Sequence, residues 1–329
     1  MGSGFGVTGW GHATPAGRVT NAELASRFGI EERWIVRRTG IHERRVVGPG
    51  ETTASLAVAA GRQALERAGL DGADIAHLVL ATATPEQPCP ATSALVQHEL
   101  GVAGSAHDVN AECSGSVYGL VTAAGLMALR PGPVLLIGSD THSPLVHPDD
   151  RDLSVLIGDG AGAVVLEPRD PGWMLAWDLG SNGAAYHSLE VRAGGSRLPT
   201  TVATAEAGLH FARMNGNDIY LKAVTYSVRS VRATLAAAGV KAADVDLVVP
   251  HQANARIVRS IAEHTGLDQD RVVDTLARFG NTGAASVLLS LAVALDDGRV
   301  RAGDVVLLAA FGAGMSWGSA LLEWDRKEL

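Results

Sequence analysis

Cys113 stands where the sequence could make a cysteine nucleophilic. A short strand-type run ends near Asn110 and an apolar helix-type run covers 114–129, so Cys113 lies at the start of a helix. A helix N-terminus stabilises an anion, which predicts a lowered thiol pKa and a nucleophilic thiolate near neutral pH. The alternative is a small buried apolar side chain, the usual role of a lone cysteine.

Two further polar residues stand next to predicted elements. His251 directly follows the strand-type run 245–249, and ligand-binding residues of α/β folds gather at the carboxyl ends of strands. A structural histidine is the equally weighted alternative. Asn281 precedes the helix-type run 284–296. Its first expected role is that of an N-cap, but a side-chain amide can also donate a hydrogen bond to a developing oxyanion.

A glycine-rich segment, Phe311-Gly312-Ala313-Gly314, follows another strand-type run. Its backbone N–H groups could stabilise an oxyanion, although an ordinary tight turn is the alternative. Two other glycine patterns, at 4–9 and 158–162, lack the strand–turn–helix order of a dinucleotide fingerprint. The histidines show no metal-ligand spacing, so we predict no metal site.

A basic cluster surrounds Trp34 in a chain whose overall charge is negative. It could be a solvated face, or it could bind a phosphate-bearing ligand or an acidic partner, with Trp34 as a stacking surface. The cluster consists of Arg33, Arg37, Arg38, Arg44 and Arg45.

The composition excludes several classes of protein. The 329 residues carry 27 Lys and Arg against 35 Asp and Glu, a net charge of −8, and 47% are apolar. Such a chain is neither disordered nor an expected nucleic-acid binder, and its two cysteines cannot form a disulfide framework. There is no signal-peptide pattern and no run of about 20 apolar residues, which predicts a cytoplasmic protein that does not span a membrane.

Predicted helices and strands, which must position these residues, alternate along the chain. This alternation predicts an α/β fold with a largely buried sheet. Helical periodicity covers 52–68, 91–100, 114–129, 218–238, 255–265 and 284–296. Strand-type runs cover 77–83, 133–137, 161–166, 245–249, 305–310 and 319–324.

An internal repeat divides the chain. Residues 62–79 and 232–249 share seven identical positions of 18 at an offset of 170. We therefore predict two homologous halves, 1–170 with the cysteine and 171–329 with the histidine and asparagine. At this offset Cys113 corresponds to Gly283, so Cys113 and Asn281 lie at corresponding helix starts that could meet at one central site.

Taken together, these motifs resemble the β-ketoacyl-acyl-carrier-protein synthase III family of thiolase-fold condensing enzymes. The resemblance implies a five-layer αβαβα fold, a homodimer, and a Cys-His-Asn site at the bottom of a pantetheine tunnel. It covers nearly the whole chain and rests on the segments 34–41, 111–116, 157–163, 250–254, 280–282 and 311–314.

The resemblance also implies individual roles. Acyl-CoA would be a substrate rather than a permanently bound cofactor, and malonyl-acyl-carrier protein or malonyl-CoA would be the second substrate. The implied catalytic residues are Cys113, His251 and Asn281, with the N–H groups of Cys113, Gly312 and Ala313 holding the oxyanion. The implied coenzyme A site comprises Trp34, Arg38, Thr39, Arg151 and Asn254. Arg256 and Lys222 would belong to the surface that docks acyl carrier protein.

Four positions depart from the family pattern. Glu112 replaces a small residue before the cysteine, and its carboxylate could oppose thiolate formation or pair with an arginine. Cys89 stands where a bulky aromatic often caps the acyl pocket across the dimer, which predicts room for a longer or branched acyl group. Leu221 occupies the place of the docking lysine, so that contact is shifted to Lys222 or lost. Gly283 replaces a common serine, with little expected effect on chemistry.

The sequence leaves three functions to be tested. The first is a decarboxylating condensing enzyme that starts fatty-acid or polyketide synthesis. The alternative is an acyltransferase on the same scaffold that moves an acyl group to an alcohol or amine. Retention of Asn281 favours condensation, and the presence of Cys113 argues against a third possibility, a non-catalytic scaffold subunit. The acyl donor, the acceptor and the pathway stay open.

Overall fold

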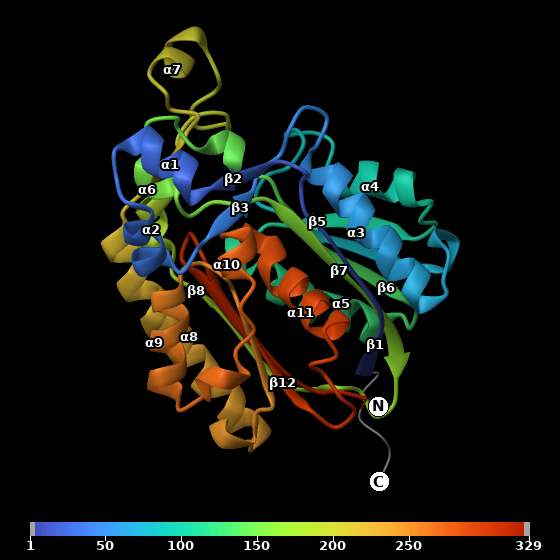
Figure 1. Ribbon diagram of the computed structural model, residues 1–329. Helices are drawn as coiled ribbons and strands as arrows, with labels where there is room; N and C mark the ends of the chain where they lie inside the picture. Colours follow the sequence, from blue (N-terminus) through green and yellow to red (C-terminus); the bar gives the residue numbers. More distant parts are fainter. Residues whose placement is uncertain (1–3, 326–329) are drawn as a thin grey trace.

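The chain folds into two stacked β-sheets with helices between and outside them, as seen in a computed structural model that describes residues 4–325. Five layers follow one another: α3 and α4, a first sheet, α5 and α11, a second sheet, and α8 with α9 (Figure 1). This arrangement confirms the predicted αβαβα fold class.

The first sheet has the strand order β1-β7-β6-β4-β5. The two β1–β7 and β7–β6 pairings are antiparallel, whereas β4 runs parallel to both β6 and β5. The strands are β1 (Gly4–Ala13), β4 (His77–Ala81), β5 (Ser105–Val109), β6 (Val134–Asp140) and β7 (Gly160–Arg169).

The second sheet repeats this pattern in the order β8-β13-β12-β11. Two antiparallel pairings again precede one parallel pairing, as expected for related halves. The predicted boundary between 170 and 171 falls between β7 and β8, but it stays a prediction. The strands are β8 (Met174–Ser181), β11 (Leu247–Pro250), β12 (Val305–Gly312) and β13 (Ser316–Glu323).

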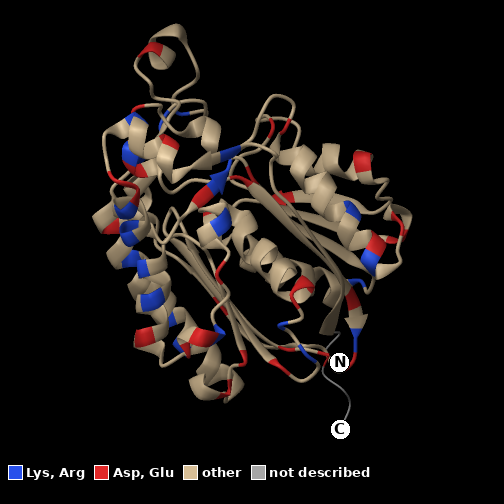
Figure 2. Ribbon diagram, in the orientation of Figure 1, with Lys and Arg blue, Asp and Glu red and all other residues tan. Residues whose placement is uncertain are grey.

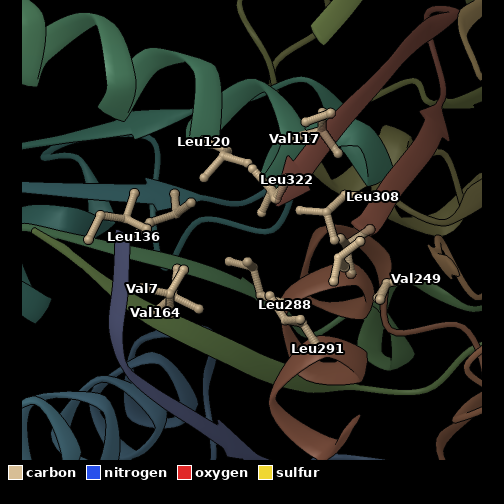
Figure 3. Close-up of a cluster of buried hydrophobic side chains, with 14 of the residues drawn as sticks. Val7, Val117, Leu120, Leu136, Val164, Val249, Leu288, Leu291, Leu308 and Leu322 are labelled. Atoms are coloured by element: carbon tan, nitrogen blue, oxygen red, sulfur yellow. The ribbon is translucent and has the colours of Figure 1, made fainter. Parts of the chain in front are cut away.

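The central helices α5 (Gly115–Leu129) and α11 (Ser286–Asp296) each contact both sheets. Both are apolar around much of their circumference, which is typical of a helix that is covered on several sides. Their apolar side chains fill the space between the sheets (Figure 3). A fully buried residue of this size contributes about 1.5–3 kcal/mol relative to an exposed one. Those in the figure include Val117, Leu120, Leu288 and Leu291, which face Leu136 of β6 and Leu308 of β12.

Outer helices begin and end at residues with clear local roles. The Thr52 side chain accepts a hydrogen bond from the Ser55 amide at the start of α3, and Gly69 ends that helix in a left-handed conformation. Asn215 and Gly239 perform the same two roles for α8. The outer helices are α3 (Thr53–Ala68), α4 (Thr92–Leu100), α8 (Gly216–Ala238) and α9 (Ala255–Thr265).

The remaining elements are short and surround the site. The helices are α1 (Asn21–Phe28), α2 (Glu32–Thr39), α6 (Arg151–Ser154), α7 (Val202–Glu206) and α10 (Leu276–Phe279). The strands are β2 (Arg18–Thr20), β3 (Glu43–Arg45), β9 (Leu189–Val191) and β10 (Ala212–Met214). In the described residues no helix is both long enough and apolar enough to cross a membrane.

Candidate active site

Cys113 lies in the 3₁₀ turn Glu112–Ser114 that leads into α5. Cys113 is only 9% exposed, and it lines a cavity between the two halves. Gly312, at the end of β12, approaches it so closely that a Cβ there would lie 2.7 Å from the Cys113 amide nitrogen. The bare backbone of Gly312 therefore allows the segment 312–313 to lie beside the N–H group of the nucleophile, as an oxyanion site would require.

The pKa of the Cys113 thiol is raised well above its ordinary value, which contradicts the lowered pKa expected at a helix start. Burial is the largest cause, and the nearby carboxyls of Glu112 and Asp140 add to it. The residue's own backbone N–H favours the thiolate, but its effect is smaller. In a dry site, desolvation outweighs the helix terminus. Burial and the two carboxyls therefore favour the thiol form of Cys113.

His251 follows β11 directly and is 3% exposed. Its Nδ1 lies 2.6 Å from the Ser286 hydroxyl at the start of α11, and the ring of Phe311 packs edge-on at 5.4 Å between centroids. Burial lowers the pKa of His251 to about 3, with a smaller contribution from His142. The imidazole is therefore neutral at physiological pH, and its ring is fixed by contacts from α11 and β12.

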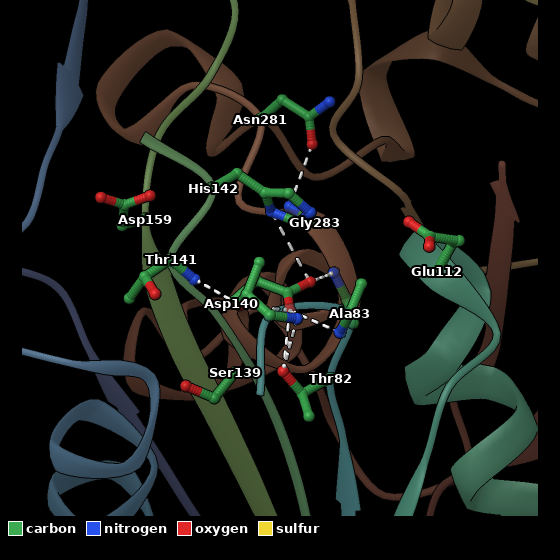
Figure 4. Close-up of polar contacts among 12 residues, drawn as sticks. Thr82, Ala83, Glu112, Ser139, Asp140, Thr141, His142, Asp159, Asn281 and Gly283 are labelled. Carbon is green, nitrogen blue, oxygen red and sulfur yellow. Dashed lines mark hydrogen bonds and ion pairs between the residues drawn. The ribbon is translucent and has the colours of Figure 1, made fainter. Parts of the chain in front are cut away.

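Asn281 is held by the backbone on both sides. Its N–H donates to the Leu156 carbonyl at 2.8 Å, and its own carbonyl accepts from the Gly158 N–H at 2.9 Å. The side-chain oxygen accepts from the Gly283 N–H at 3.0 Å, as Figure 4 shows. Asn281 is not the N-cap that the sequence suggested, because Thr282 and Ala285 occupy the cap positions of the turn and of α11; its side chain holds the turn before them and lines the cavity.

One cavity of about 590 Å³ brings the three sequence-predicted catalytic residues together. They come from both halves, on three segments that are remote in sequence. Most of the other predicted residues line the same cavity, namely Gly312, Ala313, Trp34, Arg38, Thr39, Asn254 and Arg256. Arg151, Lys222 and Cys89 do not line it.

The exposed end of this cavity carries Trp34 between two guanidinium groups. The Arg38 guanidinium carbon lies 5.5 Å from the Trp34 ring centre, and that of Arg151 lies at 5.0 Å. Both arginines are exposed, and Arg151 also pairs with Asp152 at 2.7 Å. A flat aromatic ring beside two cations is a suitable surface for a nucleotide base and its phosphates.

The basic cluster predicted around Trp34 is not one site. Arg44 is fully buried and donates hydrogen bonds to Asn21 and to the Val155 carbonyl, so it supports the fold and cannot reach a ligand. Burial lowers the pKa of Arg44 to about 10. Arg33 pairs with Glu31, whereas Arg37 and Arg38 are exposed on α2 and form no ion pair within residues 4–325.

Two predicted coenzyme A residues use their polar atoms within the protein. The Thr39 hydroxyl donates to the Ile35 carbonyl at 2.7 Å and accepts from the Ile41 amide at 3.0 Å. The Asn254 side chain caps α9 by accepting from the Arg256 amide, and its nitrogen donates to the Arg38 carbonyl at 3.2 Å. Asn254 therefore joins α9 to α2 at the edge of the cavity.

The two predicted docking residues differ. Arg256 is exposed on α9, with its guanidinium 5.3 Å from the Tyr220 ring centre. Lys222 forms an ion pair with Asp218 on the same helix and contacts Ser188, so its charge is already matched. Figure 2 shows basic residues on the neighbouring helices α2 and α9, and Arg256 of α9 lines the cavity, so a basic surface borders it.

Cys89 is exposed in the loop 85–91 and does not line the catalytic cavity. The first two residues of that loop, Pro85 and Glu86, line a second cavity of about 620 Å³. Glu112 lines this second cavity, whereas its neighbour Cys113 lines the first. The nucleophile therefore stands between two cavities, and the loop of Cys89 borders the second one.

Behind the nucleophile lies a polar group formed by Glu112, Asp140 and His142. Asp140 accepts hydrogen bonds from donors of several segments, including the Ala284 amide at 2.6 Å, and lies 3.8 Å from Nδ1 of His142 (Figure 4). Glu112 pairs with no arginine between residues 4 and 325; burial raises its pKa, and His142 opposes that shift. One of the two readings for Glu112, an arginine partner, is therefore wrong.

Gly283 is also more constrained than the sequence suggested. Its φ is +58°, and a Cβ there would lie 2.3 Å from Asp140 Oδ2 and 2.5 Å from His142 Cε1. A serine could not occupy this position while His142 and Asp140 keep their places. The small effect of Gly283 on the chemistry stays a prediction, whereas its structural role is clear, since the glycine provides the space for His142.

Sequence reasoning missed several cavity residues. Ser286 and Phe311 hold the imidazole, and the segment 214–220 forms a wall of the cavity. At the predicted offset of 170 Ser286 corresponds to Ser116, but this match gave it no role in the site. The wall segment includes the first turn of the helix-type run 218–238, and its place at the cavity is set only by the folded protein. No group of three or more residues suited to hold a metal ion occurs within residues 4–325.

A Cys-His-Asn cluster in a cavity of a five-layer αβαβα fold defines the class of thiolase-fold acyl-transferring enzymes. A family model described as 3-oxoacyl-[acyl-carrier-protein (ACP)] synthase III matches residues 107–183, and its C-terminal counterpart matches residues 235–324. The β-ketoacyl-[acyl-carrier-protein] synthase III of Roseiflexus castenholzii is 45% identical over 324 residues, which cover 97% of this chain and 98% of that protein.

The chain belongs to the β-ketoacyl-[acyl-carrier-protein] synthase III family and is an acyltransferase. A Streptomyces coelicolor relative with that name is 44% identical over 331 residues, covering 99% of this chain and 96% of its own. The crystal structure of 3-oxoacyl-(acyl carrier protein) synthase III from Pseudomonas aeruginosa superposes with a TM-score of 0.90 at 37% identity, covering 99% and 100% of the two chains. A priming β-ketosynthase of a polyketide pathway reaches a TM-score of 0.90 at 33% identity, covering 99% and 98%.

Proposed function

We propose that this enzyme transfers an acyl group from acyl-CoA to Cys113 and then condenses it with a malonyl thioester, with loss of carbon dioxide. The observation that supports this most strongly is the single cavity that contains Cys113, His251 and Asn281 together with the Trp34 surface. The product would be a β-ketoacyl thioester that primes fatty-acid or polyketide synthesis.

In the first half-reaction the Cys113 sulfur attacks the thioester carbon. The bond between that carbon and the coenzyme A sulfur breaks, and the departing thiolate takes up the proton that the Cys113 thiol has lost. The N–H groups of Cys113 and the segment 312–313 would stabilise the oxyanion, because they lie side by side at the cavity. The raised pKa of Cys113 means that thiolate formation belongs to the substrate complex.

In the second half-reaction His251 and Asn281 would hold the malonyl carbonyl. When the Ser286 hydroxyl donates to Nδ1, the neutral imidazole carries its proton on Nε2 and can donate it to that carbonyl. The carbon–carbon bond to the malonyl carboxylate breaks, carbon dioxide leaves, and the enolate is stabilised by these donors. The enolate carbon then attacks the acyl-enzyme and releases Cys113.

The exposed end of the cavity suits two thioester carriers. The base and phosphates of coenzyme A would lie against Trp34, Arg38 and Arg151. The basic surface of α2 and α9, with Arg256, would dock acidic acyl carrier protein. Lys222 would contribute little there because Asp218 neutralises it. A homodimer would bring the exposed loop of Cys89 to a partner's acyl cavity.

The test separates the half-reactions. The purified protein is incubated with a panel of acyl-CoAs and its intact mass is measured, and an acyl adduct on Cys113 is expected. Malonyl-acyl-carrier protein or malonyl-CoA is then added, and carbon dioxide and a β-keto product are measured. No adduct from any acyl-CoA would refute the proposal. Product without carbon dioxide would instead establish acyl transfer to an alcohol or amine.

A further inference from the structure

The nucleophile separates two cavities of opposite electrostatic character. The catalytic cavity is lined by Arg38 and Arg256, whereas no Lys or Arg is found among the residues that line the second one. The second cavity is lined instead by four glutamates, Glu51, Glu86, Glu112 and Glu190, and by His142. Since the thioester carrier enters from the basic side, the second cavity is where the acyl chain of the Cys113 adduct would extend.

Three of these glutamates already have partners. Glu51 accepts hydrogen bonds from the Ala16 and Gly48 amides, and Glu86 accepts one from the Ala54 amide. Glu190 pairs with Arg192 and His187. The Glu112 carboxyl differs, because it accepts no hydrogen bond from any residue between 4 and 325 and interacts at longer range with His142, Asp140 and Cys113. Glu112 is half-buried and lines the cavity, so its carboxyl is open to a ligand that supplies a hydrogen-bond donor.

The backbone at Glu112 gives an independent indication that this side chain serves a purpose. Its φ is +50°, and it is one of two non-glycine residues with a positive φ in the described chain. A glutamate in the left-handed region is strained, and glycine would adopt it freely. Strain of this kind concentrates at sites where a particular side chain is needed.

We propose that the second cavity is an acyl pocket in which Glu112 selects an acyl group that carries a protonated amine. The inference rests on the proposed transfer of an acyl group to Cys113. The Glu112 carboxyl is near enough to the Cys113 thiol to raise its pKa, so a short amino-acyl chain on that sulfur would bring an ammonium group toward the carboxylate. A charge-assisted hydrogen bond between them would satisfy the unpartnered carboxyl.

Such a substrate would also assist the nucleophile. The Glu112 carboxyl is among the groups that raise the pKa of Cys113. An ammonium group beside that carboxylate offsets its field, so the thiolate forms more easily when the matching substrate is bound. Selectivity should therefore appear in the rate of acylation as well as in binding.

The experiment is a competition between isosteric donors. The purified enzyme is given equal concentrations of β-alanyl-CoA and butyryl-CoA, which differ by an ammonium in place of a methyl group, and 3-hydroxypropionyl-CoA serves as a neutral polar donor. Initial rates of adduct formation on Cys113 are read from the intact mass. The proposal predicts that the β-alanyl adduct forms about tenfold faster or more than the butyryl adduct.

Two variants with the same charge change sharpen the result. Glu112→Gln should lose the preference for β-alanyl-CoA while butyryl-CoA still acylates Cys113. Glu66→Gln, on the exposed surface of α3, should keep the preference of the unmodified enzyme. A Glu112→Gln enzyme that acylates with butyryl-CoA is folded, so loss of the preference reports on the carboxylate itself.

The outcomes distinguish this inference from the proposed function. If no donor acylates Cys113, the proposed function fails. If the butyryl adduct forms as fast as or faster than the β-alanyl adduct, acyl transfer stands and the amine pocket is refuted. If 3-hydroxypropionyl-CoA reacts as fast as β-alanyl-CoA, the pocket selects polarity rather than charge, which also overturns the proposal. These wild-type rates decide the question even where the Gln variant does not fold.

Discussion

The starts of α5 and α11 have the same backbone in the two halves and carry different chemistry. Each begins with a 3₁₀ turn, Glu112–Ser114 in one half and Gly283–Ala285 in the other, whose first residue has a φ of +50° or +58°. Two residues before each of these stands an asparagine. The Asn110 side-chain oxygen accepts a hydrogen bond from the Glu112 N–H at 3.1 Å. In the same way, the Asn281 side-chain oxygen accepts one from the Gly283 N–H at 3.0 Å.

This correspondence shifts the register inferred from the repeat by one residue at this place. Glu112 matches Gly283 at an offset of 171, so Cys113 matches Ala284 and not Gly283. The Ala284 amide donates to the Asp140 carboxylate at 2.6 Å, whereas Cys113 presents a thiol to the catalytic cavity. Asn110 is exposed, whereas Asn281 lines the cavity. The local turn thus sets the direction of its side chains, and the groups around it decide which of the two similar turns takes part in catalysis.

Removing the Cys113 nucleophile, the chemical difference between the two turns, should have the largest effect on activity. Cys113→Ala makes the first half resemble the second at this position and should reduce product formation by about 10⁴-fold or more, because no acyl-enzyme can form. The intact mass after incubation with acyl-CoA should show no adduct. An adduct that persists in this variant would mean that another group, such as the exposed Cys89 thiol, carries the acyl chain.

The two asparagines provide a matched pair. Asn281→Ala should reduce condensation by about 10²–10³-fold, since one donor to the enolate is lost, while acylation of Cys113 continues. Asn110→Ala removes the equivalent turn contact and should leave both half-reactions intact. Each change should cost about 1 kcal/mol of unfolding free energy from the lost turn hydrogen bond.

Mass measurement of the adduct and release of carbon dioxide distinguish the two half-reactions in both asparagine variants. Equal loss of condensation in Asn110→Ala and Asn281→Ala would show that the turn, and not the amide in the cavity, is what catalysis needs. That result would remove Asn281 from the catalytic residues.

Gly283 tests whether the space behind the turn is as tight as the geometry indicates. Gly283→Ala should lower the unfolding free energy by about 2–4 kcal/mol, since the left-handed backbone and the close approach of Asp140 and His142 both oppose a Cβ. Gly298→Ala is the control, with a φ of +66° and open space around its Cβ, and should cost only about 1 kcal/mol. Denaturant unfolding at one protein concentration measures both, and equal losses would contradict the steric argument.

The sequence predicted the fold and the meeting of Cys113, His251 and Asn281 in one cavity, for identifiable reasons. Each of the six helix-type runs matches a helix of the structure to within two residues at either end, because the long helices have strong periodicity and clear ends such as Gly69 and Gly239. Strand β1 was missed, because four of its ten residues are glycine and leave no alternation to read. Helix α2 was missed because it is short and charged.

The features that the sequence could not predict depend on how deeply a residue is buried and on its neighbours in the folded protein. The thiol of Cys113 was expected to be acidic, because the helix start is visible in the sequence while the burial that overrides it is not. Arg44 looked like its neighbours and proved to be buried. The role of Gly283 depends on His142, which is 141 positions away in the chain and meets it only in the folded protein.

Substitution of Glu112 should have the smallest effect and tests the comparison of the two turns most specifically. Glu112→Gly gives the first half the residue type that the second half has at this position, and it should raise the unfolding free energy by about 1 kcal/mol, because a strained left-handed glutamate is replaced by the residue that adopts this region freely. Glu112→Gln keeps the strain and removes only the charge, so a gain confined to Gly identifies the backbone as its source. Denaturant unfolding at neutral pH separates the two. A loss of stability in Glu112→Gly would mean that the carboxyl holds the turn in place, and the strain would then have a structural and not a functional reason.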